Sequence, residues 1–310
     1  MSKTAIIFPG QGAQHPGMGK DVAESSDAAQ SVYSRANEIL GWDIAELCFN
    51  GPAEKLNGTD IQQPAIFVTS VAIWKALEAK GITQSLDPQA MAGLSLGEYT
   101  ALHLAGWLDF ADALRLVAER GRLMQSAATQ SAGGMVSLMG LDEPQTVALC
   151  NEAALGEPLG PANFNCPGQI VISGAKAACQ RALTLAEKHG ARAVALDVAG
   201  AFHSPLMGPA VTGLEKALAD AKIAPGRIPV VSNVSARYHG DPSSVRTLLR
   251  EQVAKPVRWQ ASIEGLIAQG FDRFVEVGPG RVLTGLMRRI NRSATALNFS
   301  TAAAIDKGIG

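Results

Sequence analysis

Short apolar runs that end at glycine alternate with longer segments of helical spacing in the first part of the chain. Residues 4–8 form one such run before Pro9-Gly10, and residues 89–93 form another that stops at a second glycine-rich turn. Compact apolar runs of this length are typical of buried parallel strands. Helices are expected in the segments 61–77, 98–104 and 111–127. The pattern therefore predicts an α/β body.

The pattern changes between about residues 130 and 200, where the elements become shorter. The expected order is strand 134–141, helix 143–154, strands 162–165 and 169–173, helix 175–189 and strand 193–198. This β-α-β-β-α-β order is the plan of a small ferredoxin-like subdomain. We therefore predict a ferredoxin-like subdomain at 130–198, inserted into a body made of 1–129 and 199–310.

The body is predicted to resume after the subdomain with alternating helices and strands. The expected elements are helix 205–221, strand 229–232, helices 243–253 and 260–269, strand 273–277 and a helix after Gly278-Pro279-Gly280. Residues 302–310 are small and weakly patterned, which predicts a frayed end.

Composition narrows the class of protein. Over 310 residues, 47% are hydrophobic and 18% charged, which is typical of a globular protein with a large core. The 27 basic and 28 acidic side chains give a net charge of -1, so neither nucleic acid nor an anionic membrane is an expected partner. No signal peptide or membrane span is predicted, and the cysteine spacing indicates neither a metal site nor disulfides. These features favour a cytoplasmic protein.

The segment Gly93-Leu94-Ser95-Leu96-Gly97 has the pattern G-x-S-x-G. Two glycines at this spacing permit a sharp turn between a strand and a helix that exposes the serine hydroxyl, and the helix directs its positive end at the site. The same pattern can also be a glycine turn with an incidental serine. The strand before it and the helix after it favour Ser95 as a nucleophile.

A serine nucleophile needs a base, and His203 is the best placed of five histidines because it lies in a loop between a predicted strand and helix. A solvated loop histidine is the alternative. His103 lies about two helical turns beyond Ser95, so packing explains it better. Asp197 could orient the imidazole or could be a surface residue, and a backbone carbonyl or side-chain amide could orient the ring instead.

Several motifs stand together in one order: residues 8–14 (FPGQGAQ), 93–98 (GLSLGE), 163–169 (NFNCPGQ) and 201–204 (AFHS). With them the chain resembles the malonyl-CoA:acyl carrier protein transacylases of fatty acid synthesis and the related acyltransferase domains of polyketide synthases. The resemblance runs from about residue 4 to 299. It implies an α/β-hydrolase-like body that carries the ferredoxin-like subdomain, and transfer of malonyl from malonyl-CoA to the phosphopantetheine thiol of an acyl carrier protein. No cofactor or metal is implied.

The resemblance also implies roles for single residues. Ser95 would be the acylated nucleophile and His203 its base and acid, while Gln252 would take the place of the aspartate that orients the histidine. The backbone N–H groups of Gln11 and Leu96 would hold the thioester oxygen.

The same resemblance assigns the acyl group to two further side chains. Arg120 would pair with the free carboxylate of malonate, although a solvated arginine near Arg115 and Arg122 is the alternative from the sequence alone. Phe202 would occupy the space of an α-methyl group. The chain departs from the family at Leu94, where histidine is usual, so rate or acyl preference is expected to differ.

Three alternatives remain at this point: a stand-alone polyketide-synthase acyltransferase of broader acyl choice, a serine thioesterase or esterase, and a non-catalytic docking subunit. An acidic carrier protein would need a local basic patch. The candidates are the arginines expected on the last helix, or a pair at the edge of the subdomain: Arg281, Arg288, Arg289 and Arg292, or Lys188 and Arg192.

Overall fold

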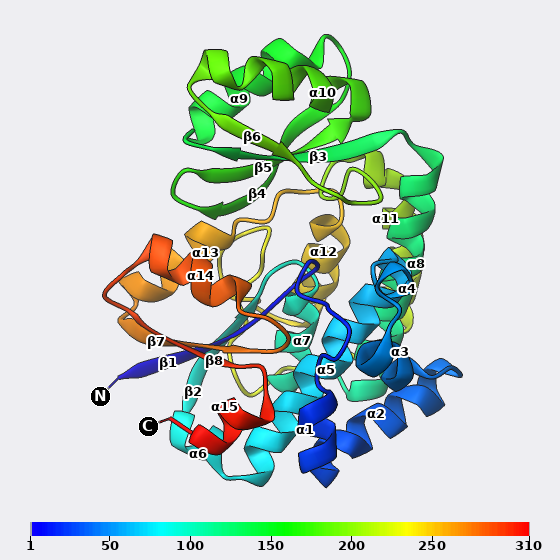
Figure 1. The fold of residues 1–310 in the computed structure, drawn as a ribbon, viewed down its shortest axis with the longest axis vertical. Coiled ribbons are helices and arrows are strands. Elements are labelled where there is room, and N and C mark those ends of the chain that lie inside the picture. The colour runs from blue at the N-terminus through cyan, green and yellow to red at the C-terminus, as the bar shows by residue number, and fades with distance from the viewer. Residues whose placement is uncertain (1, 310) are drawn as a thin grey trace.

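The computed structural model describes residues 2–309 and contains two sheets, one above the other in Figure 1. The larger unit has a parallel sheet with the strand order β2-β1-β7-β8. Its strands are β1 (Lys3–Phe8), β2 (Pro88–Gly93), β7 (Phe271–Val277) and β8 (Thr295–Phe299). The apolar run of β1 is buried on both faces between β2 and β7, as expected for a central parallel strand.

The helices that pack around this sheet come from two parts of the chain, one before and one after the smaller second unit, whose elements run from 133 to 195. Those before that unit are α1 (Lys20–Ser25), α2 (Asp27–Leu40), α3 (Ile44–Asn50), α4 (Ala53–Leu56), α5 (Thr59–Ala79), α6 (Ile82–Leu86), α7 (Gly97–Leu104) and α8 (Phe110–Gln130). Those after it are η2 (Pro205–Met207, a 3-10 turn), α11 (Gly208–Asp220), α12 (Pro242–Gln252), α13 (Trp259–Ala268), α14 (Val282–Ile290) and α15 (Ala302–Lys307). Among residues 2–309, none of these helices has the length and hydropathy needed to cross a membrane.

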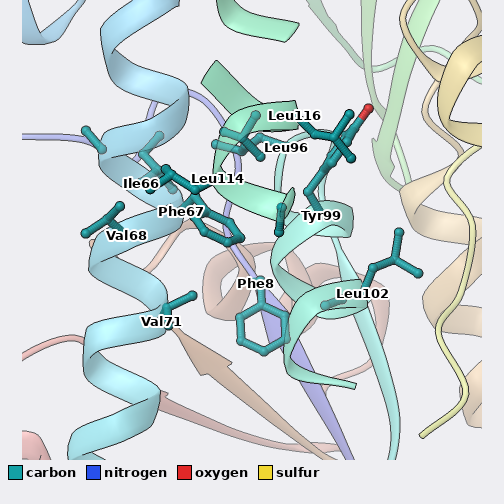
Figure 2. Packing of buried hydrophobic residues seen from close by; sticks show 14 of the residues in the cluster. Phe8, Ile66, Phe67, Val68, Val71, Leu96, Tyr99, Leu102, Leu114 and Leu116 are labelled. Atoms are coloured by element: carbon teal, nitrogen blue, oxygen red, sulfur yellow. The ribbon is translucent and has the colours of Figure 1, made fainter. Parts of the chain in front are cut away.

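The main core lies between the sheet and α5, a helix that is buried around nearly its whole circumference. Figure 2 shows Phe8 of β1, Phe67 of α5 and Leu102 of α7 around this shared core. A helix that is apolar on all sides is stable only when other elements surround it. This packing fixes α7, and with it the turn that precedes α7.

The second sheet is antiparallel, with the strand order β4-β5-β3-β6. Its elements are β3 (Gly133–Met139), α9 (Glu143–Ala154), β4 (Leu159–Cys166), β5 (Gln169–Ala175), α10 (Lys176–Leu185), η1 (Glu187–His189) and β6 (Arg192–Ala195). The helices α9 and α10 cover one face of this sheet over a separate apolar cluster. The β-α-β-β-α-β order and the strand order are those of a ferredoxin-like unit. The division of the chain at 130–198 stays a prediction.

Two expectations about secondary structure in the later part of the chain are wrong. The segment 229–232 is not a strand, because it makes only isolated bridges from Val230 to Met91 and from Val231 to Tyr238. Residues 302–307 are not frayed, since Thr301 caps α15 and Ile305 is buried in the core. Gly310 lies outside the described residues.

The four arginines expected on the last helix lie on or next to α14, which is not the last helix of the chain. Arg281 precedes α14, Arg288 and Arg289 lie in its last turn, and Arg292 follows it. Another helix, α15, comes after them along the chain.

Candidate active site

Ser95 lies at the tip of the sharp turn between β2 and α7, with a φ of 51°. The turn requires its glycines, since a Cβ on Gly93 would lie 1.9 Å from the carbonyl carbon of Gly97, and one on Gly97 would lie 2.2 Å from the carbonyl oxygen of Phe8. The side chain of Asn233 braces the turn. It accepts a hydrogen bond from the Ser95 N–H at 2.6 Å and donates one to the Gly93 carbonyl at 2.7 Å. These contacts hold a left-handed conformation that a non-glycine residue rarely adopts.

His203 faces Ser95 from the loop before η2, with 2.8 Å between Nε2 and the serine Oγ. Its Nδ1 lies 2.6 Å from the main-chain carbonyl oxygen of Gln252. Since a carbonyl only accepts, the proton is on Nδ1, and Nε2 accepts the hydrogen bond from the serine hydroxyl. Asp197 lines the cavity but, among the described residues, does not bond to this ring. A backbone carbonyl thus takes the position that an aspartate has in a serine hydrolase.

Burial and, as a smaller cause, the positive charge of Arg120 together lower the pKa of His203 from its usual value of 6.5 to about 4. The hydrogen bond to the Gln252 carbonyl opposes the shift. The imidazole is therefore neutral near pH 7 and can take a proton from Ser95.

Arg120 of α8 lies directly behind Ser95 and is only 1% exposed. Its Nη2 donates to Ser95 Oγ and to Gln252 Oε1, each at 2.9 Å, and its Nη1 donates to Gln63 Oε1 at 2.5 Å. The guanidinium also lies over the ring of Tyr99, 5.5 Å from the centroid. All of these hydrogen-bond partners are neutral, so the site has a buried positive charge beside the serine hydroxyl.

The neighbouring arginines behave differently from Arg120. Arg115 is exposed and pairs with Asp112 at 3.6 Å, and Arg122 is exposed and pairs with Glu119 at 2.6 Å. The structure therefore singles out Arg120 as the arginine of this group that faces the site.

The predicted oxyanion donors flank Ser95. The N–H groups of Gln11 and Leu96 have no hydrogen-bond acceptor within residues 2–309. Gly10 lets the two loops meet, because a Cβ there would lie 2.3 Å from the carbonyl oxygen of Leu94. Two unengaged N–H groups on either side of a serine can stabilise negative charge on an attacked carbonyl oxygen.

Ser95 and His203 open into a cavity of about 590 Å³ between the two sheets. Residues of both units line it: Gln11, Gly12, Gln14, Asn57, Gln62, Leu94, Met135, Asn163, Asn165, Gln169, Val171, Leu196, Asp197, Val198, Ala199, Phe202, Val282 and Leu286. Of the residues expected from the sequence, Gln11, Leu94 and Phe202 lie on this wall. Arg120 and Gln252 lie behind the serine, hydrogen-bonded to it or to each other.

Sequence reasoning missed a group of buried polar residues behind the serine. Glu98, Asn233 and His239 are 0 to 5% exposed, and Glu98 forms hydrogen bonds with both of the others. Gln63 reaches Arg120 from α5. Glu98 could have been noticed in the sequence, because it is a charged residue directly after the serine turn, on a helix that packs into the core. Asn233 and His239 are far away in sequence and gave none. His103 packs against the rings of both Phe67 and Phe110, so packing explains it, as expected.

Comparison with known proteins agrees with this geometry. Residues 5–307 match the family model described as acyl transferase domain. The chain belongs to this acyl transferase family. The malonyl CoA-acyl carrier protein transacylase of Escherichia coli (strain K12) is 42% identical over 307 residues, which are 98% of each chain.

Solved structures of acyl transferases are similar along nearly the whole chain. An acyl carrier protein S-malonyltransferase from Vibrio cholerae has 42% identity and a TM-score of 0.94 over 99% of each chain. A structure of a type II PKS acyl-carrier protein in complex with its malonyl-transacylase has 40% identity and a TM-score of 0.95, again over 99% of each chain. The resemblance inferred from the motifs and the predicted α/β fold with an inserted ferredoxin-like unit are confirmed.

Proposed function

We propose that the protein transfers malonyl from malonyl-CoA to the phosphopantetheine thiol of an acyl carrier protein through a malonyl ester of Ser95. The observation that carries this proposal is a buried guanidinium, that of Arg120, 2.9 Å from a serine hydroxyl that is also 2.8 Å from a neutral imidazole. A hydrolase of neutral esters has no need of a buried cation there. An enzyme for an acyl group with a free carboxylate does.

In the first half of the reaction, Ser95 Oγ attacks the thioester carbonyl while His203 Nε2 takes the hydroxyl proton. The negative charge that forms on the carbonyl oxygen is held by the N–H groups of Gln11 and Leu96. The tetrahedral intermediate then collapses, the carbon–sulfur bond breaks, and His203 returns the proton to the coenzyme A sulfur. The carbonyl of Gln252 stabilises the imidazolium that exists between these steps.

The acyl group is selected by the residues around the serine. Arg120 exchanges its hydrogen bonds with neutral neighbours for a two-point contact with the malonyl carboxylate. An acetyl group has no free carboxylate, so Arg120 would keep its hydrogen bonds to neutral neighbours. Phe202, which is buried in the cavity wall, restricts the space beside the α-carbon.

In the second half, the carrier thiol gives its proton to His203 and its sulfur attacks the malonyl ester. Ser95 Oγ leaves, regains the proton from His203, and the malonyl group departs on the carrier. These steps balance without a metal or redox cofactor, and the proposal includes none. Four buried free thiols suit a reducing compartment, so we assign the reaction to the cytoplasm.

The carrier protein is proposed to bind beside α14. Val282 and Leu286 of this helix line the cavity, and Arg288 is exposed on its last turn. Arg289 is exposed as well and reaches the cavity wall through a 2.7 Å hydrogen bond to Gln169. The alternative pair at the subdomain edge is weaker, since Lys188 is neutralised by Glu152 at 2.7 Å.

Incubation with labelled malonyl-CoA tests the proposal. One malonyl group per chain should be found on Ser95, and adding a holo carrier protein should move the label to the carrier rather than to free malonate. Ser95→Ala should remain unlabelled, whereas Ser173→Ala, which changes a buried serine outside the cavity, should label like the unchanged protein. Labelling of Ser95→Ala would refute the ester, and release of free malonate as the main product would indicate a thioesterase.

A further inference from the structure

Glu98 is a fully buried carboxylate on α7, three residues after Ser95. Its Oε1 lies 2.8 Å from His239 Nε2. Its Oε2 accepts two hydrogen bonds, one from the Asn233 N–H at 3.0 Å and one from Gln252 Nε2 at 2.7 Å. The carboxylate does not line the cavity, so it acts through the residues that it binds.

The contacts of Gln252 fix which way its side-chain amide points. Arg120 only donates hydrogen bonds and Glu98 only accepts them, so the amide oxygen must face Arg120 and the amide nitrogen must face Glu98. The observed distances agree, with 2.9 Å from Arg120 Nη2 to Oε1 and 2.7 Å from Nε2 to Glu98. The reversed amide would place its nitrogen, a donor, against the donating guanidinium, and its oxygen, an acceptor, against the accepting carboxylate.

This chain of contacts joins two opposite buried charges through one amide. Arg120 otherwise has only neutral hydrogen-bond partners, and Glu98 reaches it by way of Gln252. The same Nε2 also donates to the carbonyl oxygen of Ser95 at 2.9 Å, which ties the amide to the serine turn. Without an acceptor at Glu98, the amide would lose the one carboxylate among the contacts that orient it, and Arg120 would be held less firmly by Gln252.

We propose that Glu98 is a positioning residue for acyl selection: it holds the Gln252 amide so that Arg120 is presented to acyl groups with a free carboxylate. This inference rests on the proposed malonyl transfer and adds a residue that affects acyl selection indirectly, through Gln252 and Arg120. Glu98 touches neither substrate nor the reacting atoms. Its effect is therefore on the preference for malonyl over acetyl.

The test is the ratio of kcat/KM for malonyl-CoA to kcat/KM for acetyl-CoA in Ser95 labelling. Both substrates compete for the same active molecules, so the ratio does not change if a variant is partly unfolded. Glu98→Ala should lower the ratio about ten- to hundredfold, because the Gln252 amide, which binds Arg120, loses its hydrogen bond to a carboxylate. Should Glu98→Ala fail to fold, Glu98→Asp gives the same reading, since it shortens the side chain while keeping the charge.

A conservative variant and a matched control complete the design. Glu98→Gln should retain most of the ratio, since the amide oxygen can still accept from Asn233 and Gln252. The amide nitrogen can donate to Nε2 of His239. The other ring nitrogen of His239 has no partner within residues 2–309. Glu276 is an equally buried carboxylate that instead binds the start of α14. Glu276→Ala should leave the ratio within about twofold of the unchanged protein.

Two results would overturn the inference while leaving the proposed function intact: a ratio in Glu98→Ala within about twofold of the unchanged protein, or an equal loss in Glu98→Gln and Glu98→Ala. An unchanged protein that labels equally with acetyl and malonyl would overturn the proposed function, and this inference with it. Loss of preference in Arg120→Ala confirms that the ratio reports the guanidinium.

Discussion

The pH at which the rate of Ser95 acylation falls on acidification, the acid limb of its pH profile, depends on the burial of His203. Burial and then the charge of Arg120 lower the pKa of this imidazole to about 4, so the ring stays neutral well below its usual range. Each pKa unit corresponds to about 1.4 kcal/mol, and the site therefore disfavours the imidazolium by roughly 3 kcal/mol. We expect kcat/KM for Ser95 acylation to be nearly constant from about pH 8 to about pH 5 and to fall only near the lowered pKa.

Removing one cause of the shift should move the limb in a known direction. Arg120→Ala deletes the positive charge beside His203, so the pKa of the ring should rise toward 6.5 and the acid limb should move to higher pH. Burial, the larger cause, remains, so the limb should stop short of 6.5. Activity would then be lost earlier on acidification in the variant than in the unchanged protein.

Stopped-time labelling of Ser95 with acetyl-CoA is the appropriate assay. Acetyl has no carboxylate, so the comparison between the two proteins is free of malonate recognition and of its titration. Circular dichroism at each pH, and recovery of the rate after return to neutral pH, separate ring protonation from unfolding. A limb near 6.5 in the unchanged protein, or the same limb in both proteins, would refute the reasoning.

Three further outcomes are expected. Gly97→Ala should lower the free energy of unfolding by roughly 2 to 4 kcal/mol in a denaturant titration, because its Cβ would overlap the Phe8 carbonyl oxygen; an unchanged midpoint would contradict the tight turn. Phe202→Ala should raise kcat/KM for methylmalonyl-CoA relative to malonyl-CoA about tenfold, since it opens the cavity wall, and an unchanged ratio would exclude this role. Charge reversal of Arg288 and Arg289 should raise KM for the carrier at low salt without changing Ser95 labelling by malonyl-CoA; equal transfer by the variant would remove α14 as the docking surface.

The elements that the sequence predicts well are those whose signal is local. Periodicity or turn chemistry is contained within a few residues in the apolar run of β1, in the glycines around Ser95, and in the α-helices and strands from 133 to 195. The helices α1 to α4 were not predicted. Three of them, α1, α3 and α4, span too few turns for a clear apolar face, whereas α2, with 14 residues, is long enough for one and was missed. The segment 229–232 looks like a strand from its apolar residues, yet only single residues of it pair with neighbours.

The site was predictable where a residue type has few other uses, and not where its role comes from distant contacts. A serine between two glycines and a histidine in a loop suggest chemistry by themselves. Asn233 holds the Ser95 N–H from 138 positions away, and nothing in its own surroundings in the sequence indicates this. The sequence left open whether a carbonyl or a side-chain amide orients His203, and the resemblance implied Gln252. Residue type alone could not show that the main-chain carbonyl of Gln252 does so, since every residue has one.

The left-handed backbone at Ser95 and at His203 has a consequence for laboratory evolution. With φ values of 51° and 56°, both positions would accept glycine with less conformational strain than the residues they have. A library selected only for heat resistance is therefore expected to drift toward glycine at position 95 and to become inert while surviving the selection. Any campaign to make this protein more robust must score turnover in every round.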